Sequence, residues 1–449
     1  MEIGKTALAS VTELTEWVTD ARRRTIELVA DLTDEQLLGP RLPIVNPLLW
    51  EIGHVAWFQD KWVLRHACGE RPYRADADSL YDSIAIPHDT RWDLPLPSRE
   101  ATLAYLRAER DRVLDKLDER EPSEELLYHV QYTVFHEDMH NEAFAYARQT
   151  LAYPAPRLAL SSGRSKPMDA TAGGPLPGDV EVPGGAFLLG AELDEPFVFD
   201  NEKWGHRVEV KPFAIARAPV TQAEFLAFVE DEGYCRPELW GGEGWRWRDE
   251  TGAEDPVYWR RVSSGNWLRR DFDQWVPLEP HRPVMHVNWH EAQAYCRWAG
   301  RRLPTETEWE VAAASEAAPG GRTLSPRKRR YPWGENIPSV DRTNLDWHAM
   351  GCVDVGALPA GDSGVGCRQM LGNVWEWTAS DFLPYPGFVP DPYKEYSEPW
   401  FGTHKVLRGG CWVTRSRLLR STYRNYSTPD RRDVWAGFRT CRGTEPEIE

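Results

Sequence analysis

The stretch Val134-Phe135-His136-Glu137-Asp138-Met139-His140-Asn141-Glu142 decides how the first third of this 449-residue chain is interpreted. It lies in the run 124–151, where apolar residues recur at spacings of three and four, as in an amphipathic helix. At about 100° per residue, His136 and His140 are one helical turn apart and project from the same side. Two imidazoles placed in this way can bind one metal ion. The stretch therefore predicts a helix that carries part of a metal site.

Three further segments of the first half show the same helical spacing, and turn-forming residues such as Gly39-Pro40 separate them. Ser98 and Ser123 each precede an acidic residue and an apolar run, which is typical of a helix start. Four helices joined by short turns predict an antiparallel four-helix bundle over residues 1–155. The predicted helices cover residues 12–32, 50–65, 98–117 and 124–151.

His54 is the candidate third ligand, because it lies in a second predicted helix, in the apolar segment Trp50-Glu51-Ile52-Gly53-His54-Val55-Ala56-Trp57. Three neutral imidazoles leave coordination positions open, as a catalytic metal requires. Histidines at this spacing also occur on helices that bind no metal. His129 shares the same face and has no matching partner in the pattern, so we interpret it as structural.

A second kind of metal site is compatible with the same residues. Glu51 with His54, and Glu137 with His140, both have the Glu-x-x-His spacing of di-iron carboxylate bundles. Such a site also needs one glutamate from each of the other two helices. The candidates lie in ordinary polar patterns, so the sequence favours the three-histidine site. These candidates are Glu27, Glu100 and Glu109.

The composition of the chain changes at residues 156–178, which are rich in Pro, Gly and Ser and are interpreted as a linker. Residues 179–449 are rich in Gly, Pro and Trp and contain only short β-like runs and few helical patterns. We therefore predict an α+β protein, in which the bundle precedes a domain with little regular structure. The β-like runs lie at 186–189 and 207–210, and the helical segments at 222–230 and 289–298.

The charge balance argues against a nucleic-acid partner, because 53 Lys and Arg face 70 Asp and Glu, a net charge of −17. The one dense basic run, Arg327-Lys328-Arg329-Arg330, is expected to be a solvated loop. No apolar segment approaches the roughly 18 residues of a membrane span, so we expect no membrane insertion. The seven cysteines are scattered without a CxxC pair, which favours a reducing cytoplasm over a disulfide framework.

Six motifs stand out in the second half: Val182-Pro183-Gly184-Gly185, Pro219-Val220-Thr221, Arg302-Leu303-Pro304-Thr305-Glu306-Thr307-Glu308-Trp309-Glu310, Gly372-Asn373-Val374-Trp375-Glu376-Trp377, Arg408-Gly409-Gly410 and Ala436-Gly437-Phe438-Arg439. On these motifs, residues 179–449 resemble the formylglycine-generating-enzyme fold, which is C-type-lectin-like. The first half, with its three histidines, resembles a DinB-like four-helix bundle. This combination, in this order, is characteristic of the ergothioneine sulfoxide synthases.

Membership of that family would imply a non-heme iron enzyme that joins sulfur to hercynine, a trimethylated histidine. The resemblance implies that His54, His136 and His140 bind Fe(II), and that hercynine, a soft donor and O2 are the substrates. Formylglycine chemistry itself is excluded, because the two cysteines it requires are replaced here by Thr414 and Leu419.

The resemblance also implies roles in substrate binding and catalysis. Asn425 is expected to form a hydrogen bond to the betaine end of hercynine, and Tyr426 to pack on its trimethylammonium group. A catalytic tyrosine is expected downstream of the Asn-Val-Trp-Glu-Trp motif, and Tyr385 is our candidate proton donor beside the metal. The further substrate-binding candidates are Arg424, Arg431 and Met139.

One region departs from the family pattern. After the second helix, the family usually carries Ser-Tyr-Tyr followed by spaced arginines, which help to bind γ-glutamylcysteine. Here the region reads Ser79-Leu80-Tyr81-Asp82-Ser83, with Arg91 as the one arginine up to residue 92. Loss of the carboxylate clamp favours a neutral selenosugar donor and hence a selenoneine-type enzyme. The donor-site candidates are Tyr81, Asp82 and Ser83.

Three other functions stay open on the sequence. An ergothioneine sulfoxide synthase would use cysteine or γ-glutamylcysteine as the donor. A DinB-like thiol transferase would use the same histidines with zinc and would need no oxygen. A non-catalytic protein with the same fold would bind a ligand and carry no metal. Neither the oligomeric state nor the oxidation state of the product is indicated by the sequence.

Overall fold

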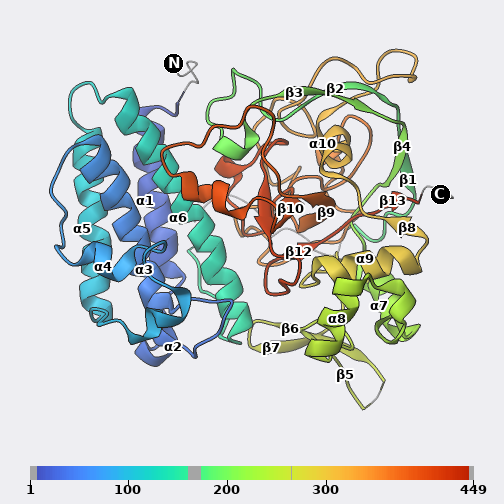
Figure 1. Cartoon of the computed structure of the whole chain (residues 1–449), viewed down its shortest axis with the longest axis horizontal. Coiled ribbons are helices and arrows are strands. Elements are labelled where there is room, and N and C mark those ends of the chain that lie inside the picture. Colours follow the sequence, from blue (N-terminus) through green and yellow to red (C-terminus); the bar gives the residue numbers. More distant parts are fainter. Residues whose placement is uncertain (1–7, 160–172, 264, 444–449) are drawn as a thin grey trace. The chain divides into compact units, whose positions relative to one another are not determined.

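The computed structural model describes residues 8–159, 173–263 and 265–443 (Figure 1). Residues 160–172 of the predicted linker lie outside this described part. Two compact units make up the chain. The first unit contains the N-terminal helices together with the short segments 194–197 and 271–274, and the second contains the remainder.

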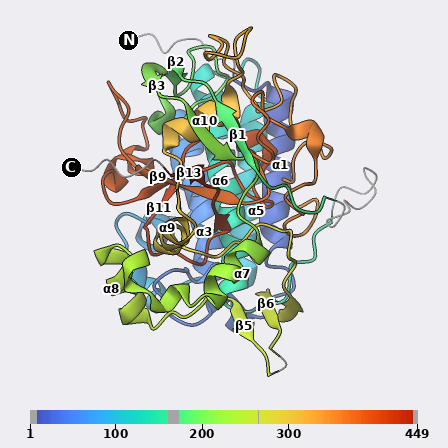
Figure 2. The ribbon, with the colours of Figure 1, turned by 90° about the vertical axis from the view of Figure 1, so that its right-hand side faces the viewer.

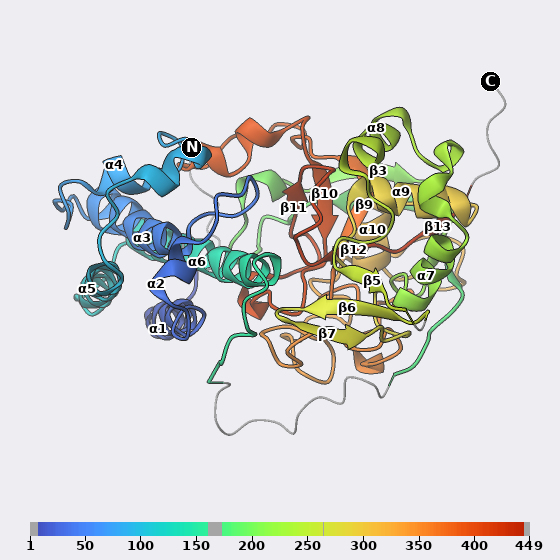
Figure 3. The same ribbon diagram turned by 90° about the horizontal axis from the view of Figure 1, so that it is seen from below.

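The first unit confirms the predicted helical bundle (Figures 1 and 3). Its long helices are α1 (Val11–Glu27), α3 (Leu48–Gln59), α5 (Arg99–Leu117) and α6 (Glu124–Thr150). Helix α1 packs against α5 and α6, and α3 packs against the same two helices. The two helices that carry the predicted ligands are therefore neighbours. The shorter elements are α2 (Asp34–Leu38), the π-helix η1 (Asp60–Ala67), α4 (Ala77–Tyr81) and the 3₁₀-helix η2 (His88–Asp93).

Both predicted serine caps are confirmed. The Ser98 hydroxyl accepts a hydrogen bond from the backbone N–H of Ala101 at 3.2 Å, and Ser123 accepts one from Leu126 at 3.1 Å. Each bond satisfies one of the N–H groups that a helix start leaves without an intrahelical partner. These caps explain why α5 and α6 begin where the sequence predicts.

The second predicted helix differs from expectation. The segment 50–65 was predicted as one α-helix, whereas α3 ends at Gln59 and the chain continues as the π-helix η1. A π-helix shifts the hydrogen bonds from i+4 to i+5 and rotates the following side chains around the axis. The apolar spacing continues through both segments, so hydrophobic periodicity alone did not distinguish them.

The second unit is built from small sheets joined by long connections (Figure 2). One four-stranded sheet has the order β1 (Asp179–Val182), β4 (Phe213–Ala216), β13 (Cys441–Arg442) and β8 (Arg301–Arg302). Another has the order β11 (Asn425–Ser427), β10 (Lys405–Arg408), β9 (Trp375–Asp381) and β12 (Ala436–Gly437). The smaller sheets are the pair β2 (Gly185–Leu189) and β3 (His206–Val210), and the triplet β5 (Trp259–Arg261), β6 (Trp267–Asp271) and β7 (Gln274–Pro277).

The two β-like runs predicted in this half pair with one another, with Phe187 opposite Val208 in an antiparallel register. Both predicted helices are confirmed as α7 (Gln222–Glu230) and α9 (Trp289–Trp298). Two helices were missed, α8 (Gly242–Thr251) and α10 (Glu306–Ala314). The start of α8 is glycine-rich, which lowers helix propensity, whereas the capping box that starts α10 was present in the sequence.

Buried ion pairs accompany the tryptophan-rich core of the second unit. Arg408 is fully buried and pairs with Glu306 at 2.9 Å and with Glu310 at 2.6 Å. Lys328 also pairs with Glu310, at 2.6 Å, and is largely buried. The expectation that the basic run 327–330 is solvated is therefore wrong for Lys328. Its side chain points inward because it neutralises a carboxylate that is removed from water.

All seven cysteines are free thiols. A search of the described residues found no helix with the length and apolar character that crossing a membrane requires. The candidate metal site lies in the helical unit.

Candidate metal centre

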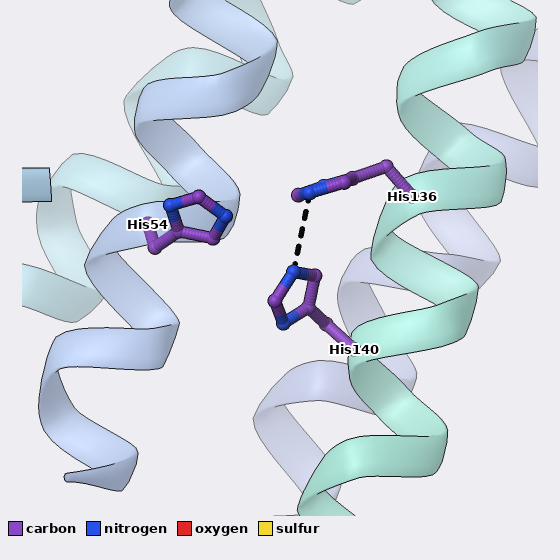
Figure 4. Close-up of side chains that lie close together, drawn as sticks. All are labelled: His54, His136 and His140. Atoms are coloured by element: carbon purple, nitrogen blue, oxygen red, sulfur yellow. Dashed lines mark hydrogen bonds between the residues drawn. The ribbon is translucent and has the colours of Figure 1, made fainter. Parts of the chain in front are cut away.

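Three histidines meet in the interior of the bundle (Figure 4). His54 comes from α3, and His136 and His140 come from α6. One ring nitrogen of each lies within 4.8 Å of those of the other two, and the rings point toward one another. The structure thus brings together the three residues predicted to hold a metal.

Contacts on its far side fix the orientation of His54. Its Nδ1 lies 2.8 Å from the backbone carbonyl oxygen of Tyr81. A carbonyl can only accept a hydrogen bond, so Nδ1 carries the proton and Nε2 keeps its lone pair. The indole of Trp50 stacks on the imidazole with ring centres 4.9 Å apart and an interplanar angle of 12°. His54 is thereby held as a neutral ligand that presents Nε2.

The other two histidines are held by α3. The Nδ1 of His140 donates a hydrogen bond to Glu51 Oε1 at 2.7 Å, and Glu51 is only 2% exposed. The ring of His136 stacks on Phe58 with centres 3.5 Å apart. A carboxylate behind a ligand histidine fixes its tautomer and increases the basicity of the metal-facing nitrogen. Helix α3 therefore supplies one candidate ligand and the groups that orient the other two.

Burial keeps two of the three candidate ligands, His54 and His136, neutral. It lowers the pKa of His54 and of His136 well below the ordinary histidine value, and the neighbouring His140 lowers both pKa values further. Neutral imidazoles have the free lone pair that metal binding requires. At neutral pH these two side chains are ready to act as ligands without losing a proton.

The donor set fits a transition metal. The Nε2 atoms of His136 and His140 lie 3.1 Å apart. Metal–nitrogen bonds of about 2.1 Å place neighbouring ligand nitrogens roughly 3.0–3.4 Å apart. Three imidazoles without a thiolate suit iron, zinc, copper or nickel and are unsuited to magnesium or calcium. A single transition-metal ion therefore fits between the three rings.

The alternative di-iron site is contradicted by the hydrogen bonds of its glutamates. Glu137 is buried and accepts bonds from Arg22 at 2.9 Å and from Thr25 at 2.7 Å, both on α1. Glu51 accepts the bond from His140, and Glu109 pairs with Arg112 at 2.9 Å. Each of these three carboxylates is thus engaged by another side chain, and Glu137 bonds to α1 and not to α3, the helix that carries His54.

The donor-site candidates follow α3 in the chain. Tyr81 is fully buried, its side chain packs against Gly53, and burial raises its pKa to about 12. Asp82 is half-buried, pairs with Lys61 at 3.2 Å and accepts a backbone bond from Ile84. The main contribution of Tyr81 in the structure is its carbonyl, which orients His54.

Arg91, the one arginine of this region, is buried and already bonded. It donates to the Asn46 side chain at 2.6 Å and to the carbonyl oxygens of Ser83 at 3.1 Å and Ile86 at 3.3 Å. Its guanidinium also lies over Trp50, 4.0 Å from the ring centre. Arg91 thus supports the indole that stacks on His54. Met139 is half-buried and lies on α6 between the two ligand histidines.

The remaining predicted residues belong to the second unit. Tyr385 is 7% exposed and packs in the core, where burial raises the pKa of its phenol well above the ordinary value. The guanidinium of Arg424 lies 4.1 Å from the Tyr385 ring centre and pairs with Glu306 at 2.7 Å. The structure thus brings Tyr385 and Arg424 together.

The betaine-site candidates lie at the edge strand β11. Tyr426 stacks on Phe382 with ring centres 4.0 Å apart, and its hydroxyl donates to the backbone oxygen of Tyr396. Asn425 is half-buried beside it. Arg431 pairs with Asp433 at 2.6 Å in the loop beyond. An aromatic cluster of this kind offers the ring faces that bind quaternary ammonium groups.

Sequence reasoning missed the orienting residues Glu51, Phe58 and Trp50. Glu51 was considered only as a ligand, although its position one turn before His54 was visible. The signal was a carboxylate within an apolar helical run, which is costly unless it has a partner.

Two family models match the chain. The DinB superfamily matches residues 18–144, and the sulfatase-modifying factor enzyme 1-like domain matches residues 164–444. The second match covers more than half of the chain. Together the two matches follow the order of the helical unit and the sheet-containing unit.

Curated relatives align over the whole chain. The hercynine oxygenase of Mycolicibacterium thermoresistibile is 40% identical over 442 residues, covering 95% of this chain and 94% of the relative. That of Mycobacterium tuberculosis is 38% identical over 423 residues, covering 93% and 96%. The formylglycine-generating enzyme of Streptomyces coelicolor is 31% identical over 319 residues, covering 66% of this chain and 97% of the relative.

Proposed function

The chain belongs to the hercynine oxygenase family, and from this premise we propose that it is an oxygen-dependent enzyme acting on hercynine. The reaction joins a soft chalcogen donor to the imidazole carbon between the two ring nitrogens. The observation that carries the proposal is the three-histidine site, whose ligand nitrogens lie within 4.8 Å of one another. The alignment over 95% of the chain supports the same assignment.

The proposed metal is Fe(II), held by His54, His136 and His140. Iron would supply the redox chemistry with O2 that a bond-forming oxidation needs, together with affinity for a soft donor. Zinc suits the same nitrogens but has no redox chemistry. The chain's contribution is to orient the rings, through Glu51 and the Tyr81 carbonyl, while burial keeps His54 and His136 neutral.

We propose that residues of the second unit bind hercynine and supply a proton. Tyr426 offers an aromatic face to the trimethylammonium group, supported by its stacking on Phe382, and Asn425 bonds to the carboxylate end. Tyr385 Oη is the proposed proton donor, since a phenol carries its proton at neutral pH. Arg424 positions Tyr385 from the face of its ring. The other proposed contacts to substrate are Met139 and Arg431.

A selenosugar is the donor we propose. A dipeptide donor needs a cationic clamp for its carboxylates, and Arg91 is occupied by Asn46 and by two backbone carbonyls. Asp82 and Ser83 offer polar groups of the kind that bind sugar hydroxyls. The alternative donors are cysteine and γ-glutamylcysteine, which would make the product an ergothioneine precursor.

The test is an assay of iron-reconstituted protein with hercynine and O2, offering the selenosugar, cysteine and γ-glutamylcysteine separately, with products identified by mass. A hercynine adduct from the selenosugar alone supports the full proposal. An adduct from either thiol alone refutes the selenium donor and leaves the family activity intact. His136→Ala is expected to abolish product formation, whereas His66→Ala, which removes an exposed imidazole of the same unit, leaves it unchanged.

The assay also tests a different class of enzyme. A DinB-like thiol transferase would be active with zinc and without oxygen. Product from the zinc-loaded protein under nitrogen would therefore refute the oxygenase proposal.

A further inference from the structure

A pocket outside the predicted sites lies in the second unit, with a volume of about 210 Å³. It is lined by the start of α8 and by one face of α9, and the two helices lie side by side (Figures 1 and 3). The lining residues are Gly241, Gly242, Glu243, Gly244, Trp289, His290, Gln293 and Arg297.

The pocket opens onto a helix N-terminus that no side chain caps. Gly241 is the N-cap residue of α8, and the first helical bond runs from Trp245 N to Gly241 O at 2.8 Å. In the described part of the chain, the N–H groups of residues 242–244 therefore have no acceptor. No atom lies within 4 Å of the Cβ position at Gly242, and residues 242 and 243 are exposed, so the start of α8 is open at these two residues. Free N–H groups at a helix start attract an anion.

Two side chains of α9 complete the anion-binding side. Arg297 donates to the carbonyl oxygen of Leu239 at 2.9 Å, and its other terminal nitrogen lies 3.5 Å from the Cβ position at Gly241. His290 is 8% exposed, and its ring nitrogens form no hydrogen bond within the described residues. A Cβ at Gly244 would lie 3.2 Å from His290 Cβ, so glycine allows the close approach of α8.

A negatively charged side chain, Glu243, also lines the pocket. Glu243 is exposed and forms no ion pair in the described part of the structure. The formal charges of Glu243 and Arg297 cancel, so the lining favours a ligand with both signs over a free anion. Trp289 supplies an apolar wall, fixed by a hydrogen bond from Nε1 to the Thr378 carbonyl at 2.8 Å. A few convergent polar groups beside an aromatic wall are typical of small-molecule sites.

We propose that this pocket binds a small α-amino acid. The ligand carboxylate binds to the N–H groups of residues 242–244 and to Arg297, and the ligand ammonium binds to Glu243. His290, as a neutral imidazole, adds one donor and one acceptor. The lining contains none of the predicted metal-binding or betaine-binding residues, so the proposal does not depend on the proposed function.

The proposal is tested with three small probes on the full, metal-free chain. L-alanine carries both charged groups, propionate lacks the ammonium, and ethylamine lacks the carboxylate. Ligand-observed NMR titration is expected to show saturable binding of L-alanine, with propionate and ethylamine each about tenfold weaker, as loss of one charge-assisted bond implies. Arg297→Ala is expected to weaken L-alanine about tenfold, and Glu243→Gln to make L-alanine and propionate bind equally.

Arg246→Ala is the matched control, because it removes an exposed arginine of α8 that does not line the pocket. It should leave binding of L-alanine unchanged. The proposal is overturned if L-alanine shows no saturable binding, if propionate binds as tightly as L-alanine to the unmodified chain, or if Arg297→Ala binds like the control. Thermal unfolding of each variant verifies that it is folded, and Glu243→Gln tests the site even if Arg297→Ala unfolds.

Discussion

Replacing Glu51 with glutamine is expected to weaken metal binding without dismantling the site. The carboxylate is 2% exposed and accepts the Nδ1–H of His140 at 2.7 Å. A hydrogen bond to a charged group is worth about 1.5–3 kcal/mol, and one between neutral groups about 0.5–1.5 kcal/mol. Glutamine retains an acceptor oxygen but loses the charge, so the loss is about 1–1.5 kcal/mol. Metal affinity should therefore fall roughly tenfold.

The assay is an anaerobic competition titration of Fe(II) between the protein and a chromogenic chelator. Glu16→Gln is the matched control, because it makes the same change at an exposed position of α1. The control should bind Fe(II) like the unmodified chain. An unchanged affinity in Glu51→Gln would refute the idea that the carboxylate increases the basicity of His140, and an equal loss in both variants would attribute the effect to net charge alone.

Three other perturbations test the packing around the site. Arg22→Met leaves Glu137 as an unpaired buried charge and should lower the free energy of unfolding of the bundle by about 3–5 kcal/mol, measured by chemical denaturation. Burial raises the pKa of Glu109 to about 7, so its folded form binds a proton more tightly than its unfolded form. Stability should fall as pH rises from about 4.5 to 7, and Glu109→Gln should flatten that fall in urea titrations across pH. Gly53→Ala places a Cβ 2.2 Å from the Tyr81 ring, so both the thermal midpoint and the Fe(II) affinity should drop. An unchanged Fe(II) affinity would show that Tyr81 does not orient His54 for metal binding.

The bundle could be predicted because its signals are local. Apolar spacing marks the helices, and Ser98 and Ser123 mark two of their starts. The i,i+4 spacing of His136 and His140 gives two ligands on one face of a single helix, whatever the tertiary structure. His54 required a further assumption, that its helix packs beside α6. The helical spacing of apolar residues throughout the first half supports that assumption.

The supporting groups could not be predicted in the same way. Glu51 and Glu137 have the same Glu-x-x-His relation to a ligand histidine, yet Glu51 bonds to His140 while Glu137 bonds to Arg22. The difference depends on which helix lies opposite each face, and that is a tertiary property. Helix α8 was missed because a run of glycines has low intrinsic helix propensity, which packing overrides.

The sharing of the candidate metal site between α3 and α6 has a consequence for the folding of the bundle. Helix α3 gives one candidate ligand and orients a candidate ligand of α6, so a bound ion would tie together two helices that are far apart in the chain. Metal concentration then acts as a stability variable, contributing RT ln(1 + [metal]/Kd) to the folded state. Hydrogen exchange of both helices should slow on loading, while α1, held to α6 by Arg22 and Glu137, keeps its own protection. Removal of the metal by a chelator would therefore weaken the contact between α3 and α6 and leave the contact between α1 and α6 unchanged.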